Sequence, residues 1–233
     1  MKIITDLQKE LNSDIHLFKN ENVEIVAPSV EILDQDIDGD KILRALERAI
    51  RTAYQSFDKM SEDSHYNIIK LILSKKHEST LEHEKLTFKI ITNRGVTHEL
   101  VRHRIASYTQ ESTRYVDPFK KGGYKIIYPS RLHDKDEETK KKWFETHENI
   151  AKVYKELIES GFKPEEARGI LPNDIKTEII VTMNLREIRH FINLRGSQFA
   201  HPDIRIIALS FLKDLKEKIP LLFDDLYENY FTK

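Results

Sequence analysis

The sequence predicts an α/β protein of the α+β type, with a single domain in which helices flank a central mixed sheet. Segments with apolar residues at helical spacing are interspersed with short segments in which apolar and polar residues alternate strictly. The seven glycines form neither GxGxxG nor GxxxxGK(S/T), which argues against a Rossmann crevice. With 233 residues, the chain is long enough for one core that buries about 70 to 75% of the unfolded surface.

The first elements follow the leading polar segment. Val23 to Ala27 predicts a strand, because it carries alternating β-branched residues. Lys41 to Tyr54 predicts a helix, because its apolar residues recur at intervals of three and four. Asp38 or Asp40 precedes this run and is a candidate for its N-terminal cap.

The central elements come next. A second helix is expected over Ser64 to Ser74, and the alternation of Leu86, Phe88 and Ile90 with polar residues predicts a strand. Val96 to Arg104 is interpreted as a short helix that ends on basic residues. If Tyr108 to Tyr115 is extended, alternate side chains share a face. The residues expected on that face are Tyr108, Gln110, Ser112 and Arg114.

The second half opens with a short candidate strand, Lys125 to Tyr128. Glu137 to Ser160 is lysine-rich and predicts a solvated helix that ends near Gly161, with Pro164 opening the next helix. Glu178 to Met183 predicts another strand.

Two helices with different faces complete the domain. Leu185 to Leu194 is expected to carry a basic polar stripe, which solvation alone could explain. From Pro202 onwards a helix carries an uninterrupted apolar stripe and is therefore predicted to be core. The stripe consists of Ile204, Ile207, Ala208, Phe211, Leu212 and Leu215.

Composition excludes several classes of protein. Lysine and arginine number 38 against 39 acidic residues, and this balance argues against a general nucleic-acid or acidic-membrane binder. No apolar run is long enough to span a membrane, and Met1 to Asn20 lacks the apolar stretch of a signal peptide, so the cytoplasm is the expected location. The absence of cysteine excludes disulfides, thiolate metal sites and a cysteine nucleophile.

The most informative segment is Arg102-His103-Arg104, followed after seven residues by Ser112 and then by Arg114. Arginine presents a planar fork of donors that matches phosphate geometry, so this cluster suits a phosphorylated or nucleotide ligand. Basic residues at a helix end followed by a polar strand would also need no ligand, so the pattern alone leaves both interpretations open.

Arg-His-Arg, seven residues and Ser resembles the signature of the flavin-dependent thymidylate synthases. Four further segments resemble motifs of that family in the same order, so the resemblance covers roughly Val23 to Tyr227. These segments are His77 to His83 (HESTLEH), Ala167 to Pro172 (ARGILP), Asn184 to Arg186 (NLR) and Asn193 to Arg195 (NLR). Residues 1–22 precede the resemblance and are expected to form a peripheral N-terminal extension to a synthase domain over residues 23–233.

The resemblance implies a flavin-binding fold that methylates deoxyuridylate (dUMP) to thymidylate (dTMP) without an enzyme thiol. FAD would carry the hydride, 5,10-methylenetetrahydrofolate would supply the carbon and NADPH would be the reductant. The sites would be shared between the subunits of a homotetramer, with Arg195 polarising the uracil. The implied flavin residues are His77, Ser79, Glu82, Arg102, His103, Arg104, Gln110, Asn184, Arg186 and His190. The implied dUMP residues are Glu99, Arg102, Gln110, Glu111, Ser112, Thr113, Arg114, Arg168 and Arg195.

Several alternatives remain open on the residues themselves. Ser112 could be a nucleophile, but it has no evident activating base, and phosphate binding is the simpler role. His77 and His83 lie near glutamates without HExxH spacing, so no metal site is predicted. His190, Glu99 and Phe199 to Pro202 depart from common family residues. The alternative functions are a flavoprotein of the same fold that acts on another pyrimidine nucleotide or as an oxidase, and a noncatalytic nucleotide- or RNA-binding domain.

Overall fold

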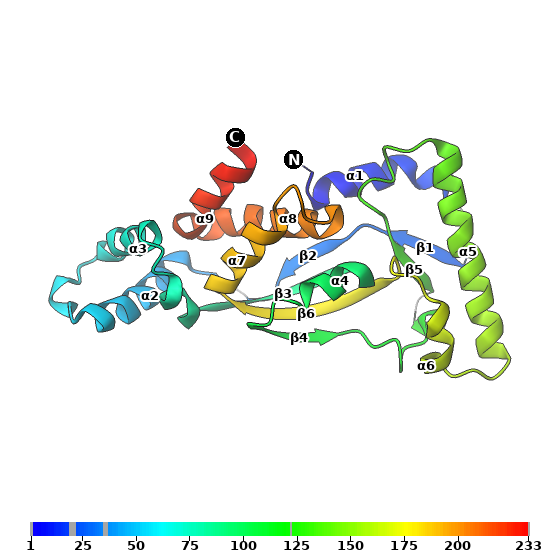
Figure 1. The fold of residues 1–233 in the computed structure, drawn as a ribbon, viewed down its shortest axis with the longest axis horizontal. Helices are drawn as coiled ribbons and strands as arrows, with labels where there is room; N and C mark the ends of the chain where they lie inside the picture. The colour runs from blue at the N-terminus through cyan, green and yellow to red at the C-terminus, as the bar shows by residue number, and fades with distance from the viewer. Residues whose placement is uncertain (1, 19–21, 35–36, 122, 233) are drawn as a thin grey trace.

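The computed structural model describes residues 2–18, 22–34, 37–121 and 123–232. It confirms the predicted mixed α/β class. The molecule is elongated, with α2 (Gly39–Tyr54) and α3 (Ser64–Ser74) at one end and α5 (Glu137–Glu159) at the other, and the sheet lies between them (Figure 1). Asp38 caps α2, because its side chain accepts a hydrogen bond from the Lys41 amide.

The strands form two sheets. The larger is antiparallel with the order β2-β3-β6-β4, and the smaller pairs β1 with β5 in parallel. An isolated bridge between Ile126 and Ile175 joins the strand pair to the chain just before β6. The strands are β1 (Val23–Val26), β2 (Ser29–Ile32), β3 (Lys85–Asn93), β4 (Ala106–Gln110), β5 (Tyr124–Ile127) and β6 (Lys176–Asn184).

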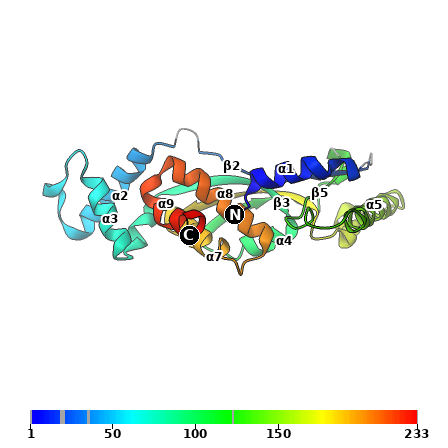
Figure 2. The same ribbon diagram turned by 90° about the horizontal axis from the view of Figure 1, so that it is seen from above.

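The main core lies between the larger sheet and α8 (Pro202–Lys218). The alternation in β3 turns Leu86, Phe88 and Ile90 inward, and each is at most 3% exposed. The Phe88 ring stacks on Phe211 with centroids 4.0 Å apart. The whole predicted apolar stripe of α8 is buried, which confirms it as core. Seen from above, α8 lies over the sheet with α9 (Pro220–Tyr227) beside it (Figure 2).

Helix α7 (Leu185–Arg195) begins directly where β6 ends. The Asn184 side chain caps the helix by accepting from the Glu187 amide at 2.8 Å. The basic stripe predicted for this helix is only partly solvated, because Arg189 is 7% exposed. Arg189 donates to both carboxylate oxygens of Asp225, at 2.9 and 2.7 Å, and so ties α7 to α9.

Two predictions around the central motif were wrong. Helix α4 covers Arg94–Leu100 and ends before the Arg-His-Arg run, which lies in the turn that follows. The helix starts early because the Asn93 side chain caps it by accepting from the Val96 amide. The predicted extended stretch ends as a strand at Gln110, since the Val116 amide donates to the Ser112 carbonyl and closes a turn. Strand alternation therefore does not place Ser112 and Arg114 on the face of Gln110.

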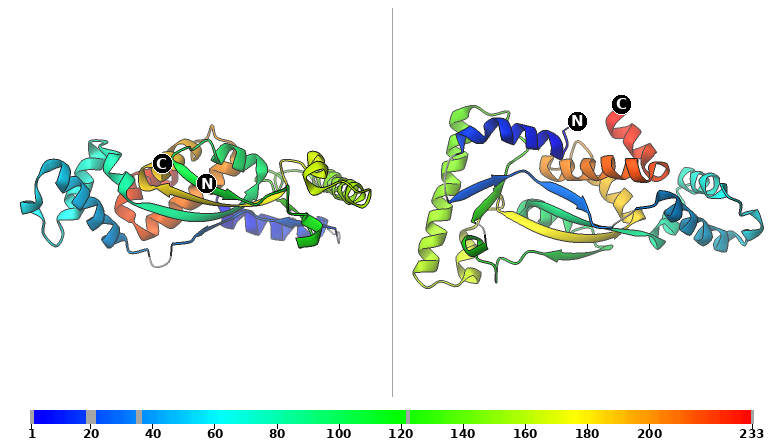
Figure 3. Two further views of the ribbon diagram at one scale, coloured as in Figure 1. Left: turned by 90° about the horizontal axis from the view of Figure 1, so that it is seen from below. Right: turned by 180° about the vertical axis from the view of Figure 1, so that it is seen from behind.

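A second apolar cluster brings together the N-terminal segment, β1, β5 and α5. Helix α1 (Ile4–Asp14) buries Leu7 and Leu11 there, and it runs from beside α8 to one end of α5 (Figure 3). This segment was expected to be peripheral, yet the structure packs it into an apolar core; residues 1 and 19–21 lie outside the described part. Helix α5 was predicted to be solvated, but it buries Lys140 and Phe144. Helix α6 (Pro164–Ala167) follows it.

None of the described helices combines the length and apolarity that crossing a membrane requires.

Candidate active site

A polar cavity of about 600 Å³ lies where β6 passes into α7, next to the 3-10 segment Glu78–His83 and α9. Four residues of the predicted flavin set line this cavity, namely Glu82, Asn184, Arg186 and His190. The elements explain this grouping, because Asn184 caps α7 while Arg186 and His190 lie one turn apart on its exposed face.

Positive and negative side chains are paired around the cavity. Arg186 forms an ion pair with Glu82, and Arg189 is held by Asp225 and by Glu78 at 3.4 Å. The pKa of Arg189 is raised, because the attraction of Asp225 and Glu78 outweighs the burial that would lower it. The Arg186 guanidinium is exposed and its partner is a surface carboxylate, so an anionic ligand can compete for it at low cost.

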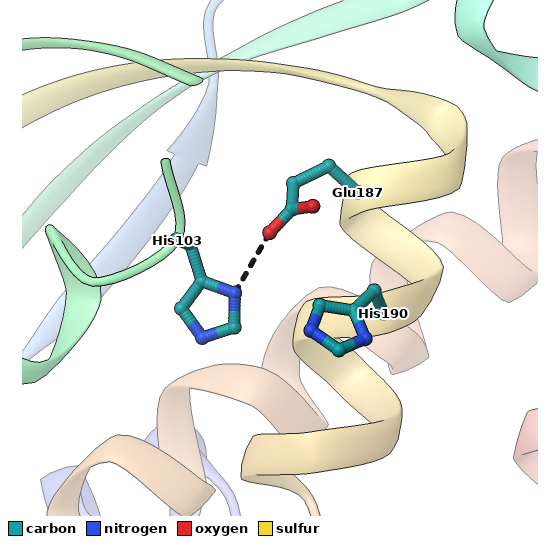
Figure 4. Close-up of side chains that lie close together, drawn as sticks. All are labelled: His103, Glu187 and His190. Atoms are coloured by element: carbon teal, nitrogen blue, oxygen red, sulfur yellow. Dashed lines mark hydrogen bonds and ion pairs between the residues drawn. The ribbon is translucent and has the colours of Figure 1, made fainter. Parts of the chain in front are cut away.

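His103 lies between Glu187, which lines this cavity, and Arg195. Its Nδ1 lies 2.8 Å from Glu187 Oε1, and its Nε2 accepts from Arg195 Nε at 3.2 Å (Figure 4 shows the first contact). Burial is the main cause that lowers the pKa of His103, and Arg195 adds to it, although Glu187 opposes both. His103 is therefore neutral at neutral pH, with its proton on Nδ1.

Arg195 ends α7 and is held on two sides. Besides its bond to His103, it donates from Nη1 to Glu99 Oε2 at 2.8 Å and from Nη2 to the Glu99 carbonyl at 3.2 Å. A guanidinium carries five N–H groups. Among the described residues these bonds occupy three of them, which leaves one N–H on each terminal nitrogen for a ligand. Glu99, a predicted dUMP residue, orients Arg195 here.

His103, Glu187 and His190 are the group most suited to a metal ion among the described residues, with ligand atoms within 4.8 Å of one another. Both ring nitrogens of His103 are already hydrogen-bonded, and the Arg195 guanidinium lies 3.2 Å from Nε2. A cation would have to displace those bonds and approach a positive charge. The arrangement fits a hydrogen-bonded chain better than a metal centre, and the absence of a metal site stays a prediction.

A second cavity of about 500 Å³ adjoins the first, and both are lined by His190 and Asn193. Arg195 and Phe199 also line it. The Phe199 ring is 90% exposed and is the most exposed of the large apolar side chains described. A ligand at Arg195 would therefore meet an aromatic surface that no part of the described chain covers.

The predicted phosphate residues gather elsewhere, around the turn that follows β4. The Ser112 hydroxyl accepts from the Arg114 amide at 3.2 Å, and Arg168 donates to the Thr113 hydroxyl at 3.3 Å. Arg114 lies 3.9 Å from Glu165, a long surface contact. Ser112 and Thr113 line a small cavity with Lys176.

Arg94 belongs to this second group, and sequence reasoning missed it. It donates to the Glu111 carbonyl at 3.4 Å, and burial together with the nearby Arg168 lowers its pKa. Two neighbouring guanidinium groups repel each other, and an anion between them would relieve that repulsion. Its position eight residues before Arg102 gave no signal, because an arginine at the start of a helix has no expected partner.

The remaining predicted residues are spread between these places. Gln110 is half-buried and donates to the hydroxyls of Thr97 and Thr177, at 2.9 and 3.2 Å. Glu111 accepts from Lys176 and from the Glu178 amide. His77, Ser79, Arg102 and Arg104 have exposed side chains, and His77 Nδ1 lies 3.3 Å from the Tyr54 hydroxyl. These four do not line either of the cavities beside Arg195.

The residues predicted to bind flavin that line the first cavity and the residues predicted to bind phosphate lie towards opposite ends of β6. Asn184 ends this strand beside the first cavity, and Thr177 lies near its start beside the phosphate residues. At about 3.3 Å per residue, seven residues of strand separate these positions by about 23 Å. The two cavities near Arg195 have no lining residue in common with the small cavity beside Ser112 and Thr113.

Residues 36–221 match the family described as thymidylate synthase complementing protein. The chain is 41% identical over 165 residues to a flavin-dependent thymidylate synthase of Pyrococcus furiosus, an alignment that covers 70% of this chain and 68% of the relative. The corresponding enzyme of Geobacter sulfurreducens is 39% identical, covering 72% of each chain. That of Saccharolobus solfataricus is 37% identical over 84% of this chain and 75% of the relative. The family match and these relatives bear out the resemblance carried by the Arg-His-Arg segment, and the chain belongs to the flavin-dependent thymidylate synthase family.

Proposed function

We propose that the protein converts dUMP to dTMP, with 5,10-methylenetetrahydrofolate as carbon donor, FAD as hydride carrier and NADPH as reductant. The observation that carries the proposal is the preorganised Arg195, which is held by Glu99 and His103 and has two N–H groups beyond the three that these bonds occupy. The chain has no cysteine, so no thiol of the enzyme takes part.

The residues around the first cavity suit FAD. The cavity of about 600 Å³ shares His190 and Asn193 with the second one of about 500 Å³, and typical small-ligand sites occupy about 300–1,000 Å³. Arg186 is a cation with only a surface partner, and it is available to a phosphate of the cofactor. Asn184 and His190 add hydrogen-bonding groups. Asn184, Arg186 and His190 would hold the FAD, which would supply the hydride for the pyrimidine once reduced by NADPH.

The chain's own residues bind and polarise the nucleotide. Arg195 stabilises negative charge as the uracil approaches its N3-ionised form, because guanidinium donors attract that charge without giving up a proton. Ser112, Thr113, Arg114 and Arg168 receive the phosphate, and the adjacent Arg94 adds positive charge. Ser112 donates a hydrogen bond to the phosphate of dUMP and does not act as a nucleophile.

We further propose that each complete site forms between subunits of a homotetramer. The phosphate residues and the flavin cavity lie towards opposite ends of β6. Closed symmetric assembly repeats every surface, so the phosphate residues of one subunit can meet Arg195 of another.

The test combines spectroscopy and turnover in one sample of purified protein. We expect the absorption bands of oxidised flavin, and formation of dTMP from dUMP that requires both methylenetetrahydrofolate and NADPH. Flavin with NADPH oxidation but without dTMP would point to the alternative, a flavoprotein that acts on another pyrimidine nucleotide or as an oxidase. A protein that cannot be loaded with flavin would contradict the proposal.

A further inference from the structure

Glu187 is a buried carboxylate that the sequence reasoning did not select. It lies in the first turn of α7 and is 7% exposed. Its amide is bound by the Asn184 cap, and its Oε1 lies 2.8 Å from His103 Nδ1. Figure 4 shows this carboxylate pointing at the imidazole ring. Burying a carboxylate costs free energy unless the carboxylate is paired and hydrogen-bonded, and the side-chain partner of Glu187 is His103.

The contact determines which nitrogen of His103 carries the proton. An ionised carboxylate only accepts hydrogen bonds, so Nδ1 must donate to it. In the neutral ring, Nε2 is then left with its lone pair, which is the acceptor that Arg195 Nε needs at 3.2 Å. The opposite tautomer would place one N–H against another. Glu187 thus fixes the orientation of Arg195 through His103, while Glu99 holds the other side of the guanidinium.

The groups that face His103 define its titration. Glu187 and Arg195 contact the ring, the His190 ring lies at 5.6 Å, and the Phe191 ring at 5.1 Å. The Tyr108 hydroxyl donates to the His103 carbonyl at 2.6 Å. Burial, Arg195 and His190 lower the pKa of His103, and Glu187 alone raises it. Protonation of Nε2 would break the bond to Arg195, so activity should fall on the acid side.

We infer that Glu187 is a positioning residue for the synthase reaction, acting on Arg195 through the tautomer of His103. The inference rests on the proposed role of Arg195 at the pyrimidine. It adds to that role a requirement for a carboxylate, and not merely a hydrogen-bonding side chain, at position 187. An amide can either accept from Nδ1 or donate to it, so glutamine would no longer impose one tautomer.

The test compares Glu187→Gln with Glu47→Gln. Glu47 is a matched control, because it is 1% exposed and bonded to Arg51 and Ser64 in the α2–α3 end of the molecule, outside the proposed site. For Glu187→Gln we expect kcat/KM for dUMP to fall about 10–100-fold, the loss seen when the hydrogen-bond partner that orients a metal-ligating histidine is removed. For Glu47→Gln we expect no change in kcat/KM, although stability falls.

The pH profile separates positioning from packing. Removing the one charge that raises the pKa of His103 must move the acid limb of kcat/KM to lower pH in Glu187→Gln. A limb at the wild-type position together with wild-type kcat/KM would overturn the inference. Absence of dTMP formation in the wild type would instead overturn the proposed function, because the tautomer can be read without turnover.

The tautomer is measured on the wild-type protein by ¹⁵N NMR of the histidine rings, with His103→Gln used only to assign the signal. We expect the proton on Nδ1 at neutral pH. A proton on Nε2 would overturn the inference even if Glu187→Gln proved too unstable to assay. The same spectrum of Glu187→Gln, where it folds, should show a larger share of the Nε2–H tautomer than the wild type, because only Arg195 then favours the proton on Nδ1.

Discussion

Asp14 at the end of α1 forms a buried ion pair with Lys140 of α5. Removing the Asp14 side chain should test how much the packing of the N-terminal helix contributes to the stability of the fold. The side chain is 6% exposed and accepts from Tyr128 at 2.5 Å, from Lys140 at 2.9 Å and from His133 at 3.2 Å. The Lys140 side chain is 8% exposed. Asp14→Ala would leave a buried ammonium without its counter-ion, which costs about 3–5 kcal/mol.

The double variant Asp14→Ala, Lys140→Met supplies the control. Replacing a buried ion pair by apolar groups is often neutral, so the double variant should recover most of the stability lost in Asp14→Ala. Unfolding in urea can be followed by circular dichroism and by fluorescence of the single tryptophan, Trp143, which packs on Phe18 in the same cluster. A loss below about 1 kcal/mol in Asp14→Ala would refute the reasoning, since even an unpaired buried polar group costs more.

The stability that Asp14 contributes should depend on pH, and it should decrease as the pH falls. Burial acts to raise the pKa of Asp14, but the hydrogen bonds from Tyr128, Lys140 and His133 together lower it. A group with a depressed folded-state pKa contributes stability above its unfolded pKa and loses it as the pH falls through the folded value. The difference in unfolding free energy between wild type and Asp14→Ala should therefore shrink below about pH 4.

Three further predictions concern the site. Arg195→Ala should lower kcat for dTMP formation by at least about 100-fold while the flavin absorption is retained; loss of flavin with intact turnover after reconstitution would contradict its role. Ser112→Ala should raise KM for dUMP with little change in kcat, since a hydrogen bond to a charged group contributes about 1.5–3 kcal/mol; a covalent serine adduct in the wild type would contradict this. Phe199→Ala should change the unfolding free energy by less than about 0.5 kcal/mol, because the ring is 90% exposed. It should raise KM for the folate, because the exposed ring beside Arg195 offers a stacking surface; an unchanged KM would contradict this role.

The fold was predictable where side-chain periodicity and burial coincide. Helix α3 has the predicted bounds, Ser64–Ser74, and the stripe of α8 is buried as expected. The errors lie where a polar side-chain contact determines a helix boundary or the burial of a residue. Asn93 caps α4 two residues earlier than the apolar pattern suggests, and nothing in the periodicity reports a side-chain cap at that position. Buried Lys140 was assigned to solvent because its partner Asp14 lies 126 residues away in the sequence.

The site likewise contains residues that the sequence motifs predicted and residues that only the fold reveals. Asn184, Arg186 and His190 were selected on motifs, and the structure brings them to one cavity because they lie within seven residues at a strand-to-helix junction. Glu187 was missed, because a glutamate in the first turn of a helix is explained by the helix dipole alone. Only the fold shows that it meets His103, which precedes it by 84 residues.

The separation of the two groups along β6 leads to a last prediction, on mixtures of inactive variants. In the proposed site shared between subunits, Arg195→Ala and Arg168→Ala damage opposite partners. If the two proteins are unfolded together and reassembled in equal amounts, about a quarter of the sites should combine two unaltered partners, given random symmetric pairing. dTMP formation should then return to about a quarter of the wild-type rate, whereas sites contained within one chain would stay inactive. Mixing without unfolding should restore nothing while subunits do not exchange, which makes it the control for carry-over of wild-type enzyme.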